Sequence, residues 1–99
     1  MVEFPSRDDF AGQSNTSFRL FFDEATIADV ALIEVSELSR RPRQESFSLL
    51  FLAPPNAPAL QQIFRVEHPV LGAFELFMVA VGRNEKGVEY EAIFNQLTD

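Results

Sequence analysis

Polar and apolar residues alternate along almost every long segment of this chain. In SFRLFF the alternation places Phe18, Leu20 and Phe22 on one face. A period of two residues is typical of a β-strand with one buried face, whereas an amphipathic helix repeats every 3.6 residues. The same two-residue period recurs near the middle of the chain in SFSLLFLA and near its end in VEYEAIFN. The chain is therefore predicted to be all-β.

Turn signals divide the alternating pattern into six predicted strands. The prolines of PPNAP lack the N–H group that a sheet needs, and Gly87 of NEKG suits a hairpin turn. RRPRQ reads as a polar loop, and APALQQIF, at 57–64, could instead form an amphipathic helix. The predicted strands cover residues 17–22, 26–38, 45–53, 60–67, 73–82 and 88–95.

The predicted fold is an antiparallel six-stranded barrel or a curled sandwich. Short turns join most of the strands, so the topology is expected to be mainly a meander. Ser6 and Asp9 have the spacing of a capping box, which predicts a short helical turn near the N-terminus. A chain of 99 residues corresponds to a single domain covering 1–99.

Composition and charge argue against several classes of protein. The formal net charge of −7 disfavours binding to nucleic acid or to an anionic membrane. The chain has no cysteine, no long apolar run, no signal-peptide pattern and no glycine-rich phosphate loop. We therefore expect a cytoplasmic protein without a cofactor, a nucleic-acid partner or a membrane partner.

The single histidine precedes a proline at the end of a predicted strand. As a metal ligand, His68 lacks a second histidine or a cysteine to complete a zinc site. As a catalytic base it would need a nucleophile, and the available Ser46 and Ser48 lie within a strand rather than on an exposed turn. The favoured interpretation is structural, with the imidazole bonding the loop backbone of a corner formed by His68, Pro69, Leu71 and Gly72.

One basic cluster stands out in this acidic chain. Arg40, Arg41 and Arg43 surround a proline, and guanidinium groups suit carboxylate or phosphate groups of a ligand or an acidic partner. The competing interpretation is a solvated loop that protects neighbouring strand edges.

Several strands carry apolar residues on both faces. If the buried face of each strand takes one set of residues, an equally apolar second set must point outward. A strand with one wet face would carry polar residues there. Either a second layer or the N-terminal segment covers this set, or it is an interface with a protein partner or a second copy, with Phe77 near its centre. The outward set is Phe21, Leu50, Leu52, Phe77, Val79, Val81 and Ile93.

Three short motifs resemble a small bacterial family of domains of unknown function. They are the Phe-x-Leu opening at Phe18, the aromatic-x-x-x-His-Pro-x-Leu-Gly corner that starts at Phe64, and the Tyr-Glu-Ala-x-Phe-Asn ending at Tyr90. The resemblance spans about residues 9–95 and carries no established activity. It implies an association with phage-tail-like assemblies, which is an analogy rather than a deduction from residues.

Three functions are compatible with these observations. The first is a non-enzymatic interaction module that serves as a subunit or accessory protein of a bacterial, phage-tail-like assembly. The second is a small barrel that binds an apolar ligand among its eleven phenylalanines. The third is a hydrolase that uses His68.

Overall fold

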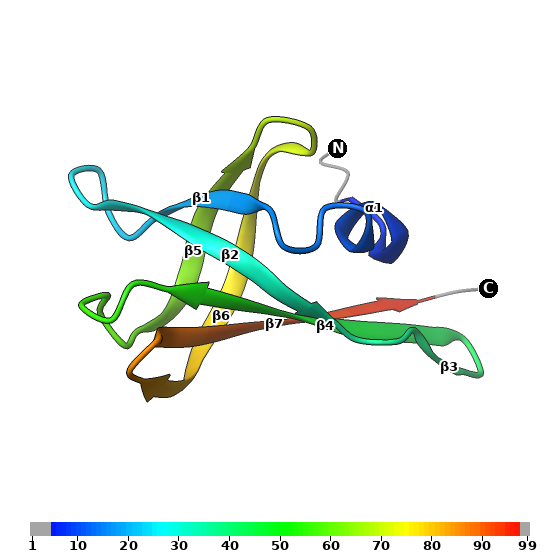
Figure 1. Cartoon of the computed structure of the whole chain (residues 1–99). Coiled ribbons are helices and arrows are strands. Elements are labelled where there is room, and N and C mark those ends of the chain that lie inside the picture. The colour runs from blue at the N-terminus through cyan, green and yellow to red at the C-terminus, as the bar shows by residue number, and fades with distance from the viewer. Residues whose placement is uncertain (1–4, 98–99) are drawn as a thin grey trace.

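The computed structural model describes residues 5–97, which form an antiparallel β-barrel with one short helix (Figure 1). The all-β prediction is confirmed. The elements are α1 (Arg7–Ala11), β1 (Ser17–Phe21), β2 (Ile27–Val35), β3 (Ser39–Arg41), β4 (Gln44–Ala53), β5 (Gln61–His68), β6 (Gly72–Asn84) and β7 (Gly87–Leu97).

Six of the strands close into a ring in which every neighbouring pair is antiparallel. Around the ring the order is β1, β2, β4, β7, β6 and β5, and β5 pairs with β1 to complete it. The strand β3 adds a short hairpin to β4 outside the ring. The ring confirms the predicted six-stranded barrel.

The topology consists of two meanders joined by one crossover. The strands β1, β2 and β4 form the first meander, and β5, β6 and β7 form the second. The proline-containing segment 54–60 carries the chain across, so β5 lies beside β1 rather than beside β4. This arrangement is a Greek key, because the fourth strand returns to pair with the first.

Two local predictions differ from the structure. RRPRQ is not simply a loop, because Ser39–Arg41 pairs with β4 and the hairpin turns at Arg43, whose φ is 64°. The helix over 57–64 does not form, since β5 begins at Gln61 and pairs with both β1 and β6. Within the predicted helix, residues 61–64 pair with residues 76–79 of β6, and the pairing with β1 follows at 65–67. These ladder bonds within the barrel outweigh the helical pattern.

The barrel interior is filled by the inward-facing residues of all six ring strands. Aromatic rings contact one another there, with ring centroids 4.7 Å apart for Phe47 and Phe94 and 5.3 Å apart for Phe18 and Phe51. Small barrels are commonly filled by their own side chains in this way. The largest fully buried side chains are those of Tyr90, Phe10, Phe18, Phe51, Phe64, Leu20, Leu32, Leu49, Met78, Val30, Val66 and Val88.

The helix α1 closes one end of the barrel. The predicted capping box is present, since the Ser6 hydroxyl accepts from the Asp9 N–H and the Asp9 carboxylate accepts from the Ser6 N–H. Phe10 of this helix is completely buried, and the centroid of its ring lies 5.7 Å from the centroids of the Phe74 and Phe94 rings. Because Phe10 contacts the inner side chains, α1 plugs the interior and does not cover the outer face of the sheet.

Two β-bulges interrupt the strands that border β4 and β7, one in β2 and the other in β6. In β2 the register shifts between Leu32 and Glu34, and in β6 it shifts between Ala80 and Gly82. Each bulge leaves one apolar residue, Ile33 or Val81, outside the regular pairing.

Polar bonds hold the crossover segment against the barrel. The buried Tyr90 hydroxyl donates to the Pro58 carbonyl, and Arg83 Nη2 donates to the Ala57 carbonyl at 2.8 Å. These bonds satisfy carbonyl groups that the prolines and the turn leave without a sheet partner.

Candidate functional site

The outer side of β4, β6 and β7 carries most of the apolar residues that alternation predicts to point outward. The exposed fractions are 53% for Phe77, 52% for Val81 and 62% for Ile93. Leu50, Leu52 and Val79 are half-buried on the same side. Single exposed apolar residues are ordinary, whereas a group on adjacent strands is a candidate contact surface. We call this group, together with Glu89 and Glu91, the outer face.

Strand register shows how the outer face is built. Glu91 of β7 stands opposite Val79 of β6 and Leu50 of β4. One step along β7, Glu89 stands opposite Leu52 of β4. The outer face therefore consists of two apolar ridges, on β6 and on β4, with a row of carboxylates between them on β7.

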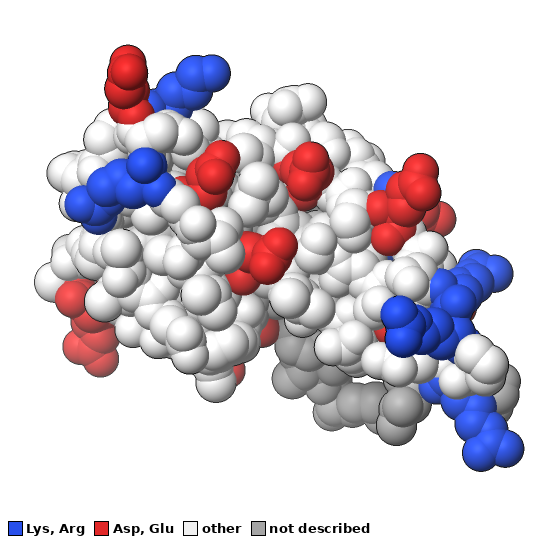
Figure 2. Space-filling view, turned by 90° about the horizontal axis from the view of Figure 1, so that it is seen from below, with Lys and Arg blue, Asp and Glu red and all other residues white. Residues whose placement is uncertain are grey.

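Figure 2 shows the molecule from below, the side on which β7 and β4 run in Figure 1. In this view acidic side chains stand singly within a broad uncharged surface, and the Lys and Arg side chains lie toward its two ends. The charge visible near the middle of this side is therefore negative.

One residue of the predicted outward set lies elsewhere. Phe21 belongs to β1, and its register partners are Ile27 on β2 and Arg65 on β5. The Arg65 guanidinium carbon lies 5.6 Å from the centroid of the Phe21 ring, which fits a cation–π contact. Phe21 is half-buried beneath this neighbour and is not part of the outer face.

Sequence reasoning missed two apolar residues beside the outer face. Ile63 of β5 stands directly opposite Phe77 and has an exposed fraction of 63%. The alternation along this strand indicates its position, because burial of Phe64 and Val66 sends Ile63 outward. Ile33 is also exposed, and the same alternation sends it outward because Val30 and Leu32 are buried; the strand register shifts at this position.

A groove lies at the end of the outer face next to the β6–β7 hairpin. Ile33 and Leu52 supply apolar walls, and Glu85 and Glu89 supply carboxylates. Asn84 and Lys86 of the hairpin complete the lining. The groove combines apolar surface with negative charge, like the rest of the outer face.

His68 is buried at the corner between β5 and β6. Its Nδ1 accepts hydrogen bonds from the backbone N–H groups of Val70, at 3.0 Å, and Leu71, at 3.3 Å. Asp23 accepts in the same way from the N–H groups two and three residues ahead, at Ala25 and Thr26. The imidazole therefore plays the role that an aspartate or asparagine oxygen plays in an Asx-turn.

The other imidazole nitrogen also has a partner. Because Nδ1 accepts, Nε2 carries the proton and donates to the Thr16 hydroxyl at 3.0 Å, and that hydroxyl donates to the Gln13 carbonyl. The ring lies 4.3 Å from the Phe18 ring, centroid to centroid. Burial lowers the pKa of His68 below its ordinary value, which favours the neutral ring that these bonds require.

The remaining corner residues fit a tight reversal of the chain. Gly72 has a φ of 89°, which favours glycine, while Pro69 is exposed and Leu71 packs against the core. The serines proposed for a hydrolase, Ser46 and Ser48, lie on β4 and are not among the hydrogen-bond partners of His68. The histidine contacts thus belong to the turn and to Thr16.

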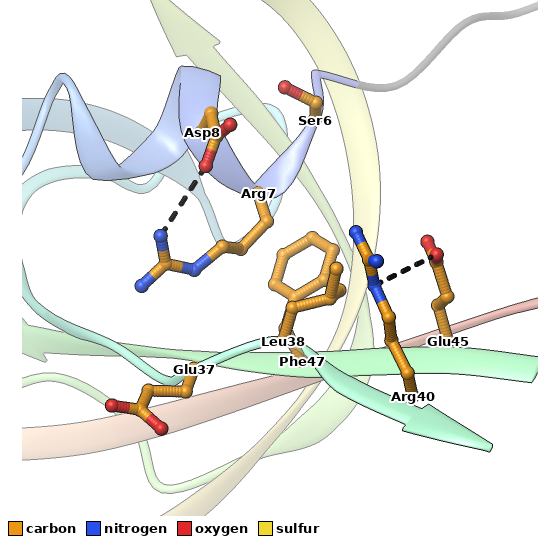
Figure 3. Close-up of a pocket in the computed structure, with 8 residues that line it drawn as sticks. All are labelled: Ser6, Arg7, Asp8, Glu37, Leu38, Arg40, Glu45 and Phe47. Carbon is orange, nitrogen blue, oxygen red and sulfur yellow. Dashed lines mark hydrogen bonds and ion pairs between the residues drawn. The ribbon is translucent and has the colours of Figure 1, made fainter.

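The basic cluster lies on and beside the β3–β4 hairpin. Arg40, Arg41 and Arg43 are exposed, and Arg40 Nε lies 3.4 Å from Glu45 Oε1. Figure 3 shows a pocket beside them in which Arg40 pairs with Glu45 and Arg7 pairs with Asp8. The three carboxylates of the pocket outnumber its two guanidinium groups, so it does not concentrate positive charge. Its lining is Ser6, Arg7, Asp8, Glu37, Leu38, Arg40, Glu45 and Phe47.

Residues 5–97 contain neither a metal-binding cluster nor a membrane-spanning helix. No group of three or more His, Cys, Asp or Glu side chains there could hold a metal ion. No helix in that part of the chain is long and apolar enough to cross a membrane.

Comparison with known proteins places the chain in a family. The searches of curated proteins and of solved structures found no match. A family model described as Domain of unknown function (DUF6916) matches residues 5–94, which cover α1, the barrel strands and the His68 corner. The predicted resemblance to a family of unknown-function domains is confirmed, and the chain belongs to the DUF6916 family.

Proposed function

We propose that this protein is a non-enzymatic protein-binding module and that the outer face is its binding surface. The observation that carries the proposal is that the interior is filled without Phe77, Val81 and Ile93, which stay more than half exposed on adjacent strands. Fold stability therefore does not account for three large apolar side chains at these positions.

The free energy available on this surface is substantial. A Phe side chain offers about 200 Å² of surface, so about half of that area remains to be buried at Phe77. At about 25 cal/mol per Å², covering it would contribute about 2–3 kcal/mol to binding. Ile63 stands beside Phe77 and widens the apolar area. Aromatic residues near the centre of an interface commonly contribute most of its binding energy.

The other candidate functions have less support. An apolar ligand inside the barrel would have to displace aromatic rings that contact each other, such as Phe22 and Phe64 at 5.5 Å between centroids. A hydrolase based on His68 would need a ring nitrogen that is free to take a proton, but both nitrogens already have partners. The proposal includes the setting that the family resemblance implies, a subunit or accessory protein of a bacterial, phage-tail-like assembly.

The test compares the wild type with Phe77→Glu by light scattering and by pull-down from host extract. We expect the wild type to self-associate or to capture a partner, and Phe77→Glu to lose that association without losing its melting transition. Ile27→Glu is the matched control, because Ile27 is a strand residue with an exposed fraction of 48% that lies outside the outer face. If all three proteins are monomers that capture nothing, or if the control behaves like Phe77→Glu, the proposal is wrong.

A further inference from the structure

We propose that the outer face binds an extended segment of another protein that carries two Lys or Arg residues two positions apart, preceded or followed at the same spacing by an apolar residue. This inference rests on the proposed function, and it specifies the chemistry of the partner.

The spacing comes from the outward residues of β7. Glu89, Glu91 and Ile93 are at alternate positions of one strand, so they lie in a row on the outer side. Alternate residues of a strand are about 6.8 Å apart. A partner strand that lies over β7 presents side chains at the same interval, and all of them face the same way.

A partner helix would fit this row less well. Its residues at i, i+4 and i+8 turn away by about 40° at each step, because the helix has 3.6 residues per turn. A helix that contacts Glu89 with one residue therefore turns its residue eight positions later away from Ile93. The three positions of β7 favour an extended occupant.

The surroundings of the carboxylates favour Lys or Arg. Leu50 and Val79 flank Glu91 across the strands, and Leu52 flanks Glu89. A Lys or Arg side chain has an apolar stem and a charged end, so it can pack along these ridges while its end meets a carboxylate. Within residues 5–97, no ion pair involves Glu89 or Glu91.

Ile93 is the residue that the apolar side chain of the partner would contact. The strand register of β6 and β7 ends at Val79 and Glu91, so Phe77 and Ile93 lie just beyond the point where the two strands separate. An apolar side chain placed there can contact either residue. At the other end of the row, the groove between Ile33 and Leu52 offers a second apolar position.

Charge argues for a different protein rather than a second copy. Two copies that met through the same face would bring Glu89 and Glu91 against one another, and each copy carries a net charge of −7. The Arg41 and Arg43 pair has the required spacing, but Arg43 lies in a turn with a positive φ and the neighbours at the same interval are polar. A basic partner would in addition be attracted over a distance.

The test is a selection of random 12-residue peptides displayed on phage against three proteins. They are the wild type, the double variant Glu89→Gln/Glu91→Gln, and the control Glu24→Gln/Asp29→Asn. The control removes the same charge from exposed positions outside the outer face.

We expect peptides selected on the wild type and on the control to be enriched several-fold in Lys or Arg at i and i+2 with an apolar residue at i+4 or i−2. The best synthetic peptide should bind the Glu89→Gln/Glu91→Gln protein at least tenfold more weakly, measured by fluorescence polarisation. Raising the salt concentration from 0.05 M to 0.5 M should weaken binding to the wild type.

Three outcomes would overturn the inference. They are no binders or no basic enrichment, the same enrichment on the Glu89→Gln/Glu91→Gln protein, or basic residues spaced at i and i+4 as on a helix. Self-association that only this double variant loses, without basic enrichment, would instead identify a second copy as the occupant. The inference and the proposed function fail separately, because the Gln variants keep Phe77 and Phe77→Glu keeps both carboxylates.

Discussion

Replacing His68 with alanine would test whether the histidine serves the corner or a function. The substitution removes the acceptor for the N–H groups of Val70 and Leu71, the donor to Thr16, and the contact with Phe18. All four partners belong to the same chain. We therefore expect a loss of stability and no direct effect on partner binding.

The size of the stability loss depends on how well water can reach the groups at the corner. Each hydrogen bond contributes about 0.5–1.5 kcal/mol net, and a buried donor left without a partner costs about 1–3 kcal/mol. Val70 is 69% exposed, so water can reach the freed N–H groups and lessen that cost. The free energy of unfolding should fall by about 1–3 kcal/mol. For a domain of this size, that is about 5–20 °C in melting temperature.

His68→Asn is the matched control. An asparagine oxygen can accept from the N–H groups two and three residues ahead, as Asp23 does in this protein, but the bond to Thr16 is lost. We expect the melting temperatures to rank wild type, then His68→Asn, then His68→Ala. Circular dichroism melts of the three proteins provide the measurement.

The wild type should also show a pH dependence that both variants lack. Burial lowers the pKa of His68 in the folded protein, whereas in the unfolded chain it titrates near about 6.5. Between the folded pKa and that value the unfolded chain binds more protons, so the free energy of unfolding falls as the pH falls. The stabilisation should be complete above about pH 6.5 and should decline below it.

Two results would contradict these expectations for His68. If His68→Ala melts at the wild-type temperature and loses its partner, the histidine belongs to a binding or reactive site rather than to the corner. A wild-type protein whose stability gains nothing relative to His68→Asn between about pH 5.5 and pH 7 would likewise contradict a neutral His68 ring in the folded protein.

Three further substitutions test the fold by thermal or urea unfolding. Phe10→Ala should cost about 3–5 kcal/mol, because Phe10 is fully buried where α1 closes the barrel, and a loss below about 1 kcal/mol would show that the helix is not a plug. Gly87→Ala should be strongly destabilising, because its Cβ would lie 1.9 Å from the Ala53 carbonyl oxygen, and a neutral result would contradict that close approach. Tyr90→Phe should cost about 1–2 kcal/mol through the lost bond to Pro58, and an unchanged protein would mean that the crossover is held by other contacts.

The features that depend on local pattern could be predicted from the sequence. Alternation alone placed Phe47, Leu49 and Phe51 inside and Leu50 and Leu52 on the other side, as the structure has them. The capping box predicted where α1 begins. In these cases the residues that form the feature also specify it.

The features that depend on distant pairing could not be predicted. Whether β5 pairs with β1 or with β4 is decided by the whole ring, and the prolines of the crossover are compatible with either. The place where Phe10 packs could not be predicted, because its contacts come from β1, β4, β6 and β7. The position of Glu89 and Glu91 between two apolar ridges follows from the register of β7 with β4 and β6, which the sequence of β7 alone does not specify.

The two bulges explain how strands with apolar residues on both faces serve a core and an outer face together. Before each bulge the even-numbered residues point inward, as Leu32 and Ala80 do, and after it the odd-numbered residues point inward. The shift turns Val35 toward the core, where it packs, and turns Arg83 toward the Ala57 carbonyl, to which it donates. A strand without a bulge would have to send one of these residues outward, because side chains alternate strictly along a regular strand. The residue left over at the β6 bulge is the exposed Val81, so the irregularity that completes the interior also adds an apolar residue to the outer face.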